Sequence, residues 1–208
     1  MIITYLGKEF FKISQGDLTI AINPISKDSK LPLKPSKFGA DIALVTTGHP
    51  DFNGLEMLSR GTEVPVTSTG AGEYEVKDVS IKGVGSGVSK NGNLTTVYRI
   101  TLENISICFL GPITELTNTA REICMNPEIL FVPVGDETHT PEAMYKIAAS
   151  LEPLIIIPME YEGVDSPMLK KFLKLAADEE APRLDKLVLK RKDLDGKEGD
   201  VMVLIPEL

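Results

Sequence analysis

The sequence predicts an α/β protein in which helices cover the outer faces of a sheet-based core. Three observations favour this fold class. Short β-rich runs separated by turns fill the first half of the chain, buried strands alternate with amphipathic helices in the second half, and 42% of the 208 residues are apolar while 25% are charged, as in globular domains. Because the composition does not shift along the chain, we expect residues 1–208 to form a single domain.

The first half is expected to consist of short strands joined by turns. Runs rich in β-branched and aromatic residues predict strands at residues 2–6, 10–13, 18–23, 41–45, 64–68, 72–84, 94–103 and 105–110. Glycine-containing turns separate the first three runs, which indicates a meander. Residues 27–38 are rich in Lys, Ser and Pro and are expected to form a loop, residues 52–60 a short helix, and the glycine-rich residues 85–93 a turn.

The second half predicts helices that alternate with strands. A polar N-cap residue followed by proline begins two helices, at Thr140-Pro141 and Ser166-Pro167, and apolar residues at helical spacing follow each start. A further helix is expected at residues 117–125. Apolar runs predict buried strands at residues 129–134 and 154–158. Two final strands, joined by a charged turn, are expected to add to a sheet or to cover its edge, at residues 186–190 and 201–205.

The charge of the chain argues against two classes of partner. The formal net charge is −8, and the sequence has no dense cluster of Lys and Arg that could neutralise several phosphates. We therefore expect neither nucleic acid nor an anionic membrane as a partner.

Other features predict a cytoplasmic location. The first residues do not have the pattern of a signal peptide, and no stretch approaches the roughly 20 apolar residues of a membrane helix. Cys108 lies in an apolar strand pattern and Cys124 in a helical one, so we expect two free, buried cysteines and no disulfide framework. Free thiols are typical of a reducing compartment.

A polar loop after the apolar strand at residues 41–45 is the strongest candidate for a functional site in the sequence. It reads Thr46-Thr47-Gly48-His49-Pro50-Asp51-Phe52, and rigid scaffolds often display reactive groups in loops at strand ends. An imidazole and a carboxylate two residues apart can share a metal ion, or act as a base and its orienting partner. On spacing alone, His49 and Asp51 are better explained as residues that hydrogen-bond the backbone of the turn.

This loop and several other segments resemble the metallo-β-lactamase superfamily, and in particular its small, cytosolic, lactonase-like branch. The loop is similar to the metal-binding signature Thr-His-x-His-x-Asp-His. Similar segments follow the family's order at Tyr5-Leu6-Gly7, at Ile20-Ala21-Ile22-Asn23-Pro24, and at residues 70–76, 131–135 and 156–159. The resemblance implies a four-layer αβ/βα sandwich, in which two mixed β-sheets carry helices on their outer faces.

The departures from the family pattern concern most of its metal ligands. His49 and Asp51 match the second histidine and the aspartate of the signature. Other residues replace the remaining ones: Thr47 the first histidine, Phe52 the histidine after the aspartate, Pro112 the bridging aspartate, Glu160 the last histidine, Asn23 the loop aspartate, and Lys8 a histidine common after the opening Leu-Gly. A further histidine expected at residues 83–89 is missing from the sequence.

The resemblance and its departures lead to two functional hypotheses. The first is a non-catalytic or altered member of the family, without a di-zinc centre or another cofactor, that acts as a binding or regulatory protein for a small molecule or a protein. The alternative is a hydrolase with a reduced mononuclear site. His49, Asp51 and Glu160 would then hold one Zn or Mn ion, and the metal-bound water would attack a lactone, an ester or a phosphoester.

Three further expectations stay open. His49 and Asp51 could perform metal-free acid–base chemistry if they faced an open pocket. His139 precedes a predicted helix and is expected to be an exposed or capping residue, and a lesser alternative is an anion site at this helix start with Gly135. A homo-oligomer is left open, because no apolar stripe indicates an interface.

Overall fold

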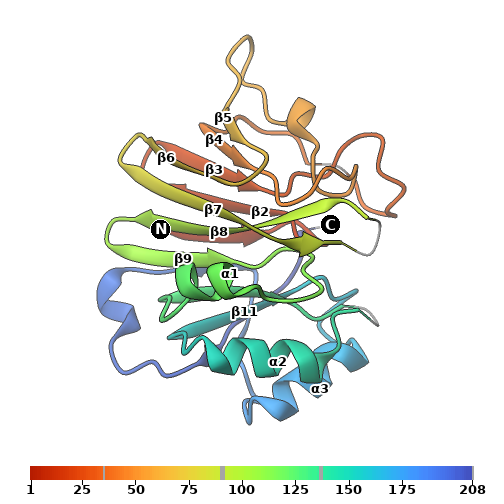
Figure 1. Ribbon diagram of the computed structural model, residues 1–208, viewed down its shortest axis with the longest axis vertical. Coiled ribbons are helices and arrows are strands. Elements are labelled where there is room, and N and C mark those ends of the chain that lie inside the picture. The colour runs from red at the N-terminus through yellow and green to blue at the C-terminus, as the bar shows by residue number, and fades with distance from the viewer. Residues whose placement is uncertain (35, 90–91, 136–137, 208) are drawn as a thin grey trace.

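Two facing β-sheets form the core of the structure, a computed structural model that describes the chain except residues 35, 90–91, 136–137 and 208 (Figure 1). Among the described residues, one sheet has six strands in the order β13-β1-β2-β3-β4-β5. These strands are β1 (Ile2–Tyr5), β2 (Phe11–Gln15), β3 (Leu18–Ile22), β4 (Ile42–Leu44), β5 (Val66–Ser68) and β13 (Lys186–Val188). The predicted meander is confirmed, because β1, β2 and β3 pair antiparallel in sequence order.

The second large sheet has seven strands among the described residues, in the order β14-β11-β10-β9-β8-β7-β6. They are β6 (Gly72–Val76), β7 (Val79–Val88), β8 (Leu94–Leu102), β9 (Ile105–Phe109), β10 (Ile129–Pro133), β11 (Ile155–Met159) and β14 (Asp200–Val201). Both sheets are mixed. In the first sheet β3, β4 and β5 run parallel, and in the second β9, β10, β11 and β14 do so.

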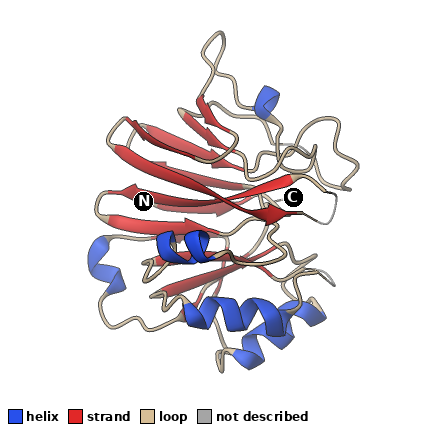
Figure 2. Cartoon of the chain, viewed as in Figure 1, coloured by secondary structure: helices blue, strands red, loops and turns tan. Residues whose placement is uncertain are grey.

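Helices cover the seven-stranded sheet. The structure has α1 (Asn118–Ile123) packed on β7, α2 (Pro141–Ser150) packed on β10, and α3 (Pro167–Leu175) packed on α2 (Figure 2). The predicted caps are confirmed: the hydroxyls of Thr140 and Ser166 accept the amides of Ala143 and Leu169. In the part of the chain that is described, no helix is long and apolar enough to cross a membrane.

Loops cover the outer face of the six-stranded sheet. Ala21 and Ala43 point away from the main core, and a smaller apolar cluster that includes Phe10, Ile25 and Leu58 packs against them. The helix expected at residues 52–60 is reduced to the single 3₁₀ turn η1 (Leu55–Met57). The predicted sandwich of two mixed sheets is therefore confirmed, with α-helices gathered on one of its outer faces.

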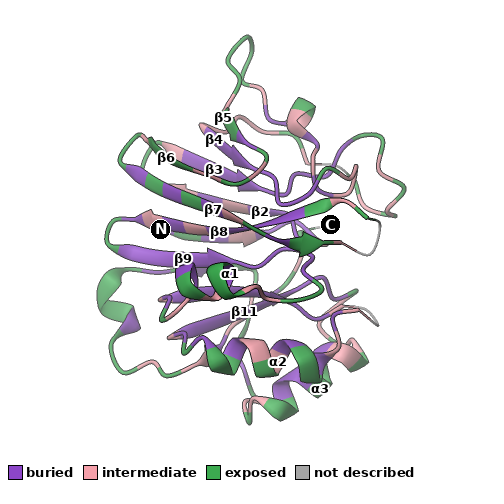
Figure 3. Ribbon diagram, in the orientation of Figure 1, coloured by how far each residue is buried: buried purple, intermediate pink, exposed green. Residues whose placement is uncertain are grey.

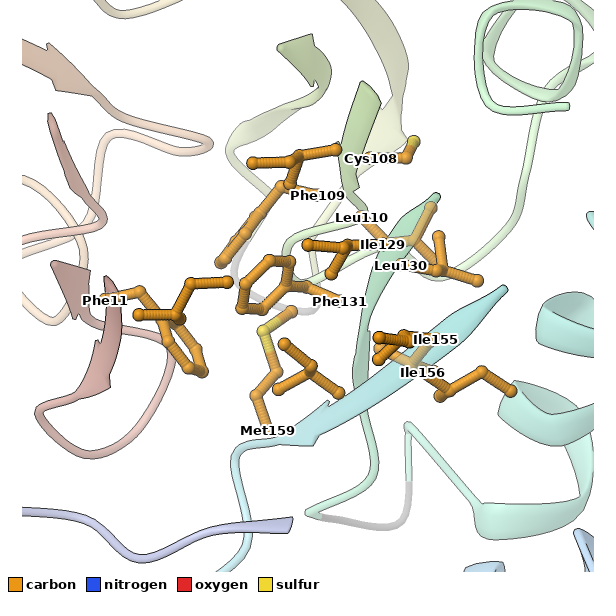
Figure 4. Packing of buried hydrophobic residues seen from close by; sticks show 14 of the residues in the cluster. Phe11, Cys108, Phe109, Leu110, Ile129, Leu130, Phe131, Ile155, Ile156 and Met159 are labelled. Carbon is orange, nitrogen blue, oxygen red and sulfur yellow. The ribbon is translucent and has the colours of Figure 1, made fainter. Parts of the chain in front are cut away.

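Aromatic side chains hold the two sheets together. The ring of Phe11 on β2 lies 4.7 Å from that of Phe131 on β10 and 5.9 Å from that of Phe109 on β9, both edge to face (Figure 4). The ring of Tyr5 stacks on that of Phe11, with the ring centroids 4.6 Å apart. All four side chains are fully buried, and β9, β10 and β11 of the seven-stranded sheet are buried along their length (Figure 3). Such pairs add to the free energy gained by burying apolar area.

Two strand predictions need correction. The run at residues 72–84 is two strands, β6 and β7, because Lys77 and Asp78 adopt left-handed backbone conformations and form a tight turn. The final strands do not form a pair: β13 joins β1, whereas the segment at 201–205 divides into β14 beside β11 and β15 (Val203–Leu204) beside β12 (Arg183–Leu184). The turn expected at 85–93 begins later, since β7 extends to Val88, and residues 90–91 lie outside the described residues.

The two cysteines are bonded to each other, so the expectation of free thiols is wrong. Cys108 on β9 and Cys124 at the end of α1 form a disulfide with their Cα atoms 5.7 Å apart. Arg99 explains the proximity: it lies opposite Cys108 in the β8–β9 pairing, and its guanidinium donates to the carbonyls of Ile123 and Met125, on either side of Cys124. The argument for a reducing compartment loses this support, and the cytoplasmic location stays a prediction.

Replacing both cysteines, in Cys108→Ala with Cys124→Ala, should lower the free energy of unfolding by about 3 kcal/mol, because a cross-link between residues 16 positions apart restricts the unfolded chain. Guanidinium unfolding of the oxidised proteins measures the difference. Reducing the wild type in denaturant should bring its refolding stability down to that of the variant. Equal stability of the oxidised wild type and the variant would contradict the expectation.

Asp41, the residue before β4, forms hydrogen bonds with a residue of each sheet. Its carboxylate accepts the Thr19 amide of β3 at 2.8 Å and the Lys77 ammonium of the β6–β7 turn at 2.5 Å. Burial by itself raises the pKa of the Asp41 carboxyl, but these two hydrogen bonds and the lysine charge outweigh burial, so the pKa lies below its ordinary value of 3.8. A carboxyl with a lowered pKa stabilises the fold above its ordinary pKa.

Asp41→Asn should therefore cost about 1 kcal/mol of unfolding free energy at neutral pH, and the difference from wild type should shrink as the pH falls through the lowered pKa of Asp41. Urea unfolding at a series of pH values measures this dependence. Asp17→Asn, at an exposed position in the β2–β3 turn, is the matched control and should change little. A difference that does not vary with pH would count against the ion pair.

Candidate functional site

The candidate site lies at the edge where the parallel strands of both sheets end. In the first sheet, Asn23 follows β3 and Thr46 follows β4. In the second sheet, Gly135 lies just beyond the end of β10 and Glu160 directly follows β11. Because the sheets face each other, these strand ends converge, as at the carboxyl edge of other α/β sheets. The polar residues singled out by the family resemblance therefore come from several strands and meet at one edge.

A buried hydrogen-bond network fills one part of this edge. The Asn23 side-chain oxygen accepts the Thr46 amide at 2.8 Å and the Thr46 hydroxyl at 2.9 Å, and its NH₂ group donates to a Glu9 carboxylate oxygen at 3.1 Å. Asn23 and Glu9 are fully buried. The Thr46 carbonyl in turn accepts the Thr96 amide of β8 at 2.8 Å. The Asn23 side chain thus holds Thr46, whose backbone carbonyl links the first sheet to β8 of the second.

The neighbouring family positions carry poor metal donors. Thr47, in place of the first histidine, forms an isolated bridge with Thr95, and its buried hydroxyl has no partner among the described residues. Gly111, before Pro112, adopts a left-handed conformation against Thr46, where a Cβ would come within 2.8 Å of the threonine Cβ. The chain here is packed closely against the buried network.

His49 and Asp51 form a local turn on the rim of this edge. The Asp51 amide donates to Nδ1 of His49 at 3.3 Å, so this imidazole nitrogen is an acceptor. A carboxylate oxygen of Asp51 lies 3.5 Å from the same nitrogen, while the other accepts the Ser29 hydroxyl at 2.5 Å. This is the turn hydrogen bonding that spacing alone favoured. The Asp51 carboxylate is hydrogen-bonded to Ser29. His49 and Asp51 therefore do not have the geometry of a general base and the carboxylate that orients it.

Glu160 lies in a separate cluster with Lys8 and His139. One carboxylate oxygen forms an ion pair with the Lys8 ammonium, and the other accepts Nδ1–H of His139 at 2.5 Å. The Glu160 and His139 side chains are only 4% and 5% exposed, whereas Lys8 is 22% exposed. The expectation that His139 is an exposed or capping residue is wrong, because it is buried against Glu160 and Thr140 caps the following helix.

The Tyr5 hydroxyl forms hydrogen bonds with the backbone of two residues of this cluster. Its hydroxyl donates to the Lys8 carbonyl at 2.7 Å and accepts the Glu160 amide at 3.0 Å. Burial is the main cause that raises the pKa of the Tyr5 hydroxyl well above its ordinary value of 10.0, so the group stays neutral and donates. Tyr5 therefore connects the cluster to the aromatic core between the sheets.

Two members of this cluster, Lys8 and Glu160, line a pocket of about 400 Å³, and we call this ion pair the floor of the pocket. The exposed Glu162 is a further charged residue of the lining, and Leu31, Leu33 and Pro206 contribute apolar walls. Its size falls within the range of small-molecule sites, which combine apolar walls with a few polar groups. His49 and Asp51 line a different pocket, of about 310 Å³, together with Leu31.

The described residues do not fit a di-zinc centre. Among them, no three or more His, Cys, Asp or Glu side chains are grouped so that they could hold a metal ion. The structure brings His49 and Asp51 together, but Glu160 makes its contacts with Lys8 and His139. A hydroxyl, a phenyl ring and a proline at the other family positions are not zinc ligands.

Comparison with known proteins settles the family. A family model described as "Beta-lactamase superfamily domain" matches residues 2–160. The chain belongs to the beta-lactamase superfamily. A search of curated proteins found no match.

Several solved structures resemble the chain over nearly its whole length. A candidate Zn-dependent hydrolase from Thermotoga maritima is 25% identical, with a TM-score of 0.78 and 99% of both chains covered. A candidate metal-dependent hydrolase from Parabacteroides distasonis is 17% identical, with a TM-score of 0.67 and coverage of 99% of this chain and 93% of that one. The metallo hydrolase Igni18 from Ignicoccus hospitalis is 16% identical, with a TM-score of 0.63 and coverage of 100% and 96%.

Sequence reasoning did not anticipate the roles of Lys8, Glu9 and His139. The sequence marks Lys8 only as a departure from the family pattern and gives no signal for Glu9, and it predicts His139 to be an exposed or capping residue. One signal was available for His139. It follows the strand β10 and Glu160 follows β11, and two parallel neighbouring strands bring the residues after their ends to the same edge.

Restoring the family residue at position 23 should destabilise this protein. Asn23→Asp removes a hydrogen bond and places a second carboxylate beside that of Glu9, both buried, so we expect a loss of at least about 2 kcal/mol of unfolding free energy at neutral pH. Chemical unfolding measures the loss. The double variant Asn23→Asp with Glu9→Gln relieves the repulsion and should regain part of it. If Asn23→Asp is as stable as wild type, the buried network is not the constraint described.

Proposed function

We propose that this chain is a binding or regulatory member of the superfamily, whose cleft takes a small molecule without a di-zinc centre. The observation that carries the proposal is the Lys8–Glu160 ion pair on the floor of the 400 Å³ pocket. A residue at a family ligand position, Glu160, is here neutralised by an ammonium group and hydrogen-bonded to His139. The remaining cleft is a pocket with a charged floor and apolar walls, which is the composition of a binding site.

The pocket indicates the general chemistry of its ligand. Leu31, Leu33 and Pro206 can contact an apolar body, whereas the Lys8–Glu160 floor favours a polar end that exchanges hydrogen bonds with it. A pocket of this volume cannot fully enclose a large substrate. We therefore propose a small, partly apolar ligand, and we keep the cytoplasmic location as part of this proposal.

A metal-dependent hydrolase is the competing function. The observation in its favour is the similarity to the Thermotoga maritima protein, which its name assigns to Zn-dependent hydrolases. In this chain, a mononuclear site of His49, Asp51 and Glu160 would require Glu160 to leave Lys8 and His139, and Asp51 to leave Ser29. Both groups are engaged in hydrogen bonds or ion pairs, which supports the binding function over the hydrolase.

Metal analysis of the purified protein, loaded separately with zinc, manganese and iron, tests the proposal. We expect much less than one metal ion per chain, because the family ligand positions carry a hydroxyl, a phenyl ring and an ion-paired carboxylate. Stoichiometric metal that is lost in His49→Ala would overturn the proposal and favour the hydrolase. Ser59→Ala, at a position that is not part of the loop, is a control for non-specific loss.

A further inference from the structure

The Lys8 ammonium is a positive charge that contacts or occupies three positions at which the family resemblance expects histidine. Lys8 itself stands at the first of these positions. Its ammonium forms an ion pair with Glu160, which stands at the second. Its Nζ atom lies 5.8 Å from the ring centroid of Phe52, which stands at the third. We infer that the Lys8 ammonium is a built-in cation that takes the place of a metal ion in this cleft. The inference rests on the proposed function, and it names the group that makes a metal-free cleft stable.

The backbone holds the ammonium and the carboxylate in place. Lys8 and Glu160 both adopt left-handed conformations, with φ of 55° and 71°, which side-chain-bearing residues seldom adopt without support. The Glu160 amide supplies this support by donating to the Lys8 carbonyl at 2.7 Å, and the Tyr5 hydroxyl contacts both residues. Gly135 packs so closely on Glu160 that a Cβ there would lie 2.0 Å from the Glu160 carbonyl oxygen.

Burial makes the positive charge necessary. A buried carboxylate is unstable without a cation or several hydrogen-bond donors, and Glu160 has its two oxygens directed at Lys8 and His139. The face of the Phe52 ring attracts the ammonium and offers no lone pair to a metal. A divalent cation entering this cluster would meet the repulsion of the ammonium at short range. The same contacts that stabilise lysine therefore disfavour a metal.

Exchanging the lysine should change this preference. Lys8→His removes the ammonium and supplies an imidazole beside Glu160 and His139, which makes three ligands of the types that hold catalytic zinc. Lys8→Met removes the charge and supplies no zinc ligand of that kind. Lys12→His is the matched control, because Lys12 is also placed over a phenylalanine ring, that of Phe38 at 5.0 Å, but away from Glu160.

The experiment measures binding of Zn²⁺ alone by calorimetry and melting temperature with and without zinc. We expect Lys8→His to bind about one zinc ion per chain and to melt higher with zinc, whereas wild type and Lys12→His do neither. Lys8→Met should melt below wild type, since it leaves the Glu160 charge buried without its ammonium. Adding Glu160→Gln to Lys8→Met should raise the melting temperature again.

The outcomes separate the inference from the function on which it rests. If folded Lys8→His takes up no zinc and Glu160→Gln does not raise the melting temperature of Lys8→Met, the built-in cation is refuted while the metal-free binding function stands. Stoichiometric zinc in the wild type overturns both. If Lys8→Met does not fold, recovery of a folded protein on adding Glu160→Gln still supports the inference, and failure to recover it counts against it.

Discussion

The packing of Phe11 between Tyr5, Phe109 and Phe131 is the contact on which the rest of the structure depends. It holds the two sheets face to face, and so brings the carboxyl ends of their parallel strands to one edge. Lys8, His139 and Glu160 belong to three distant segments of the chain and meet only because this edge exists. The Tyr5 hydroxyl extends the same core directly to the Lys8 carbonyl and the Glu160 amide.

The sequence was sufficient to predict those parts of the fold that local patterns determine. Short β-rich runs separated by glycine-containing turns indicate the meander, and Thr140-Pro141 and Ser166-Pro167 mark two helix starts, because turns and caps act over a few residues. The family resemblance supplied the arrangement of the two sheets. The short helix expected at 52–60 was reduced to one 3₁₀ turn, and the disulfide was missed, since Arg99 positions the end of α1 beside β9 through tertiary contacts.

The candidate site was predictable only in part. His49 and Asp51 follow one strand, so their proximity could be expected from spacing alone. Glu160 was identified by alignment to the family pattern, but its partner Lys8 is 152 residues away in the chain, and no local pattern joins them. The pairing of buried charges is decided by the fold, because each charge needs a partner once water is excluded.

Two of the replacements at family ligand positions are matched by the residues beside them. This argues that the cleft has been adapted and has not simply lost metal ligands. Asn23 lacks the charge of the family aspartate, and a carboxylate stands beside it at Glu9, to which Asn23 donates. Glu160 adds a negative charge where the family has histidine, and Lys8 adds the positive charge that balances it. Random loss of ligands would not by itself place an ammonium against Glu160 or an amide donor against Glu9. A cleft whose buried Glu160 charge is paired with an ammonium and which still has a pocket retains the conditions for binding a ligand.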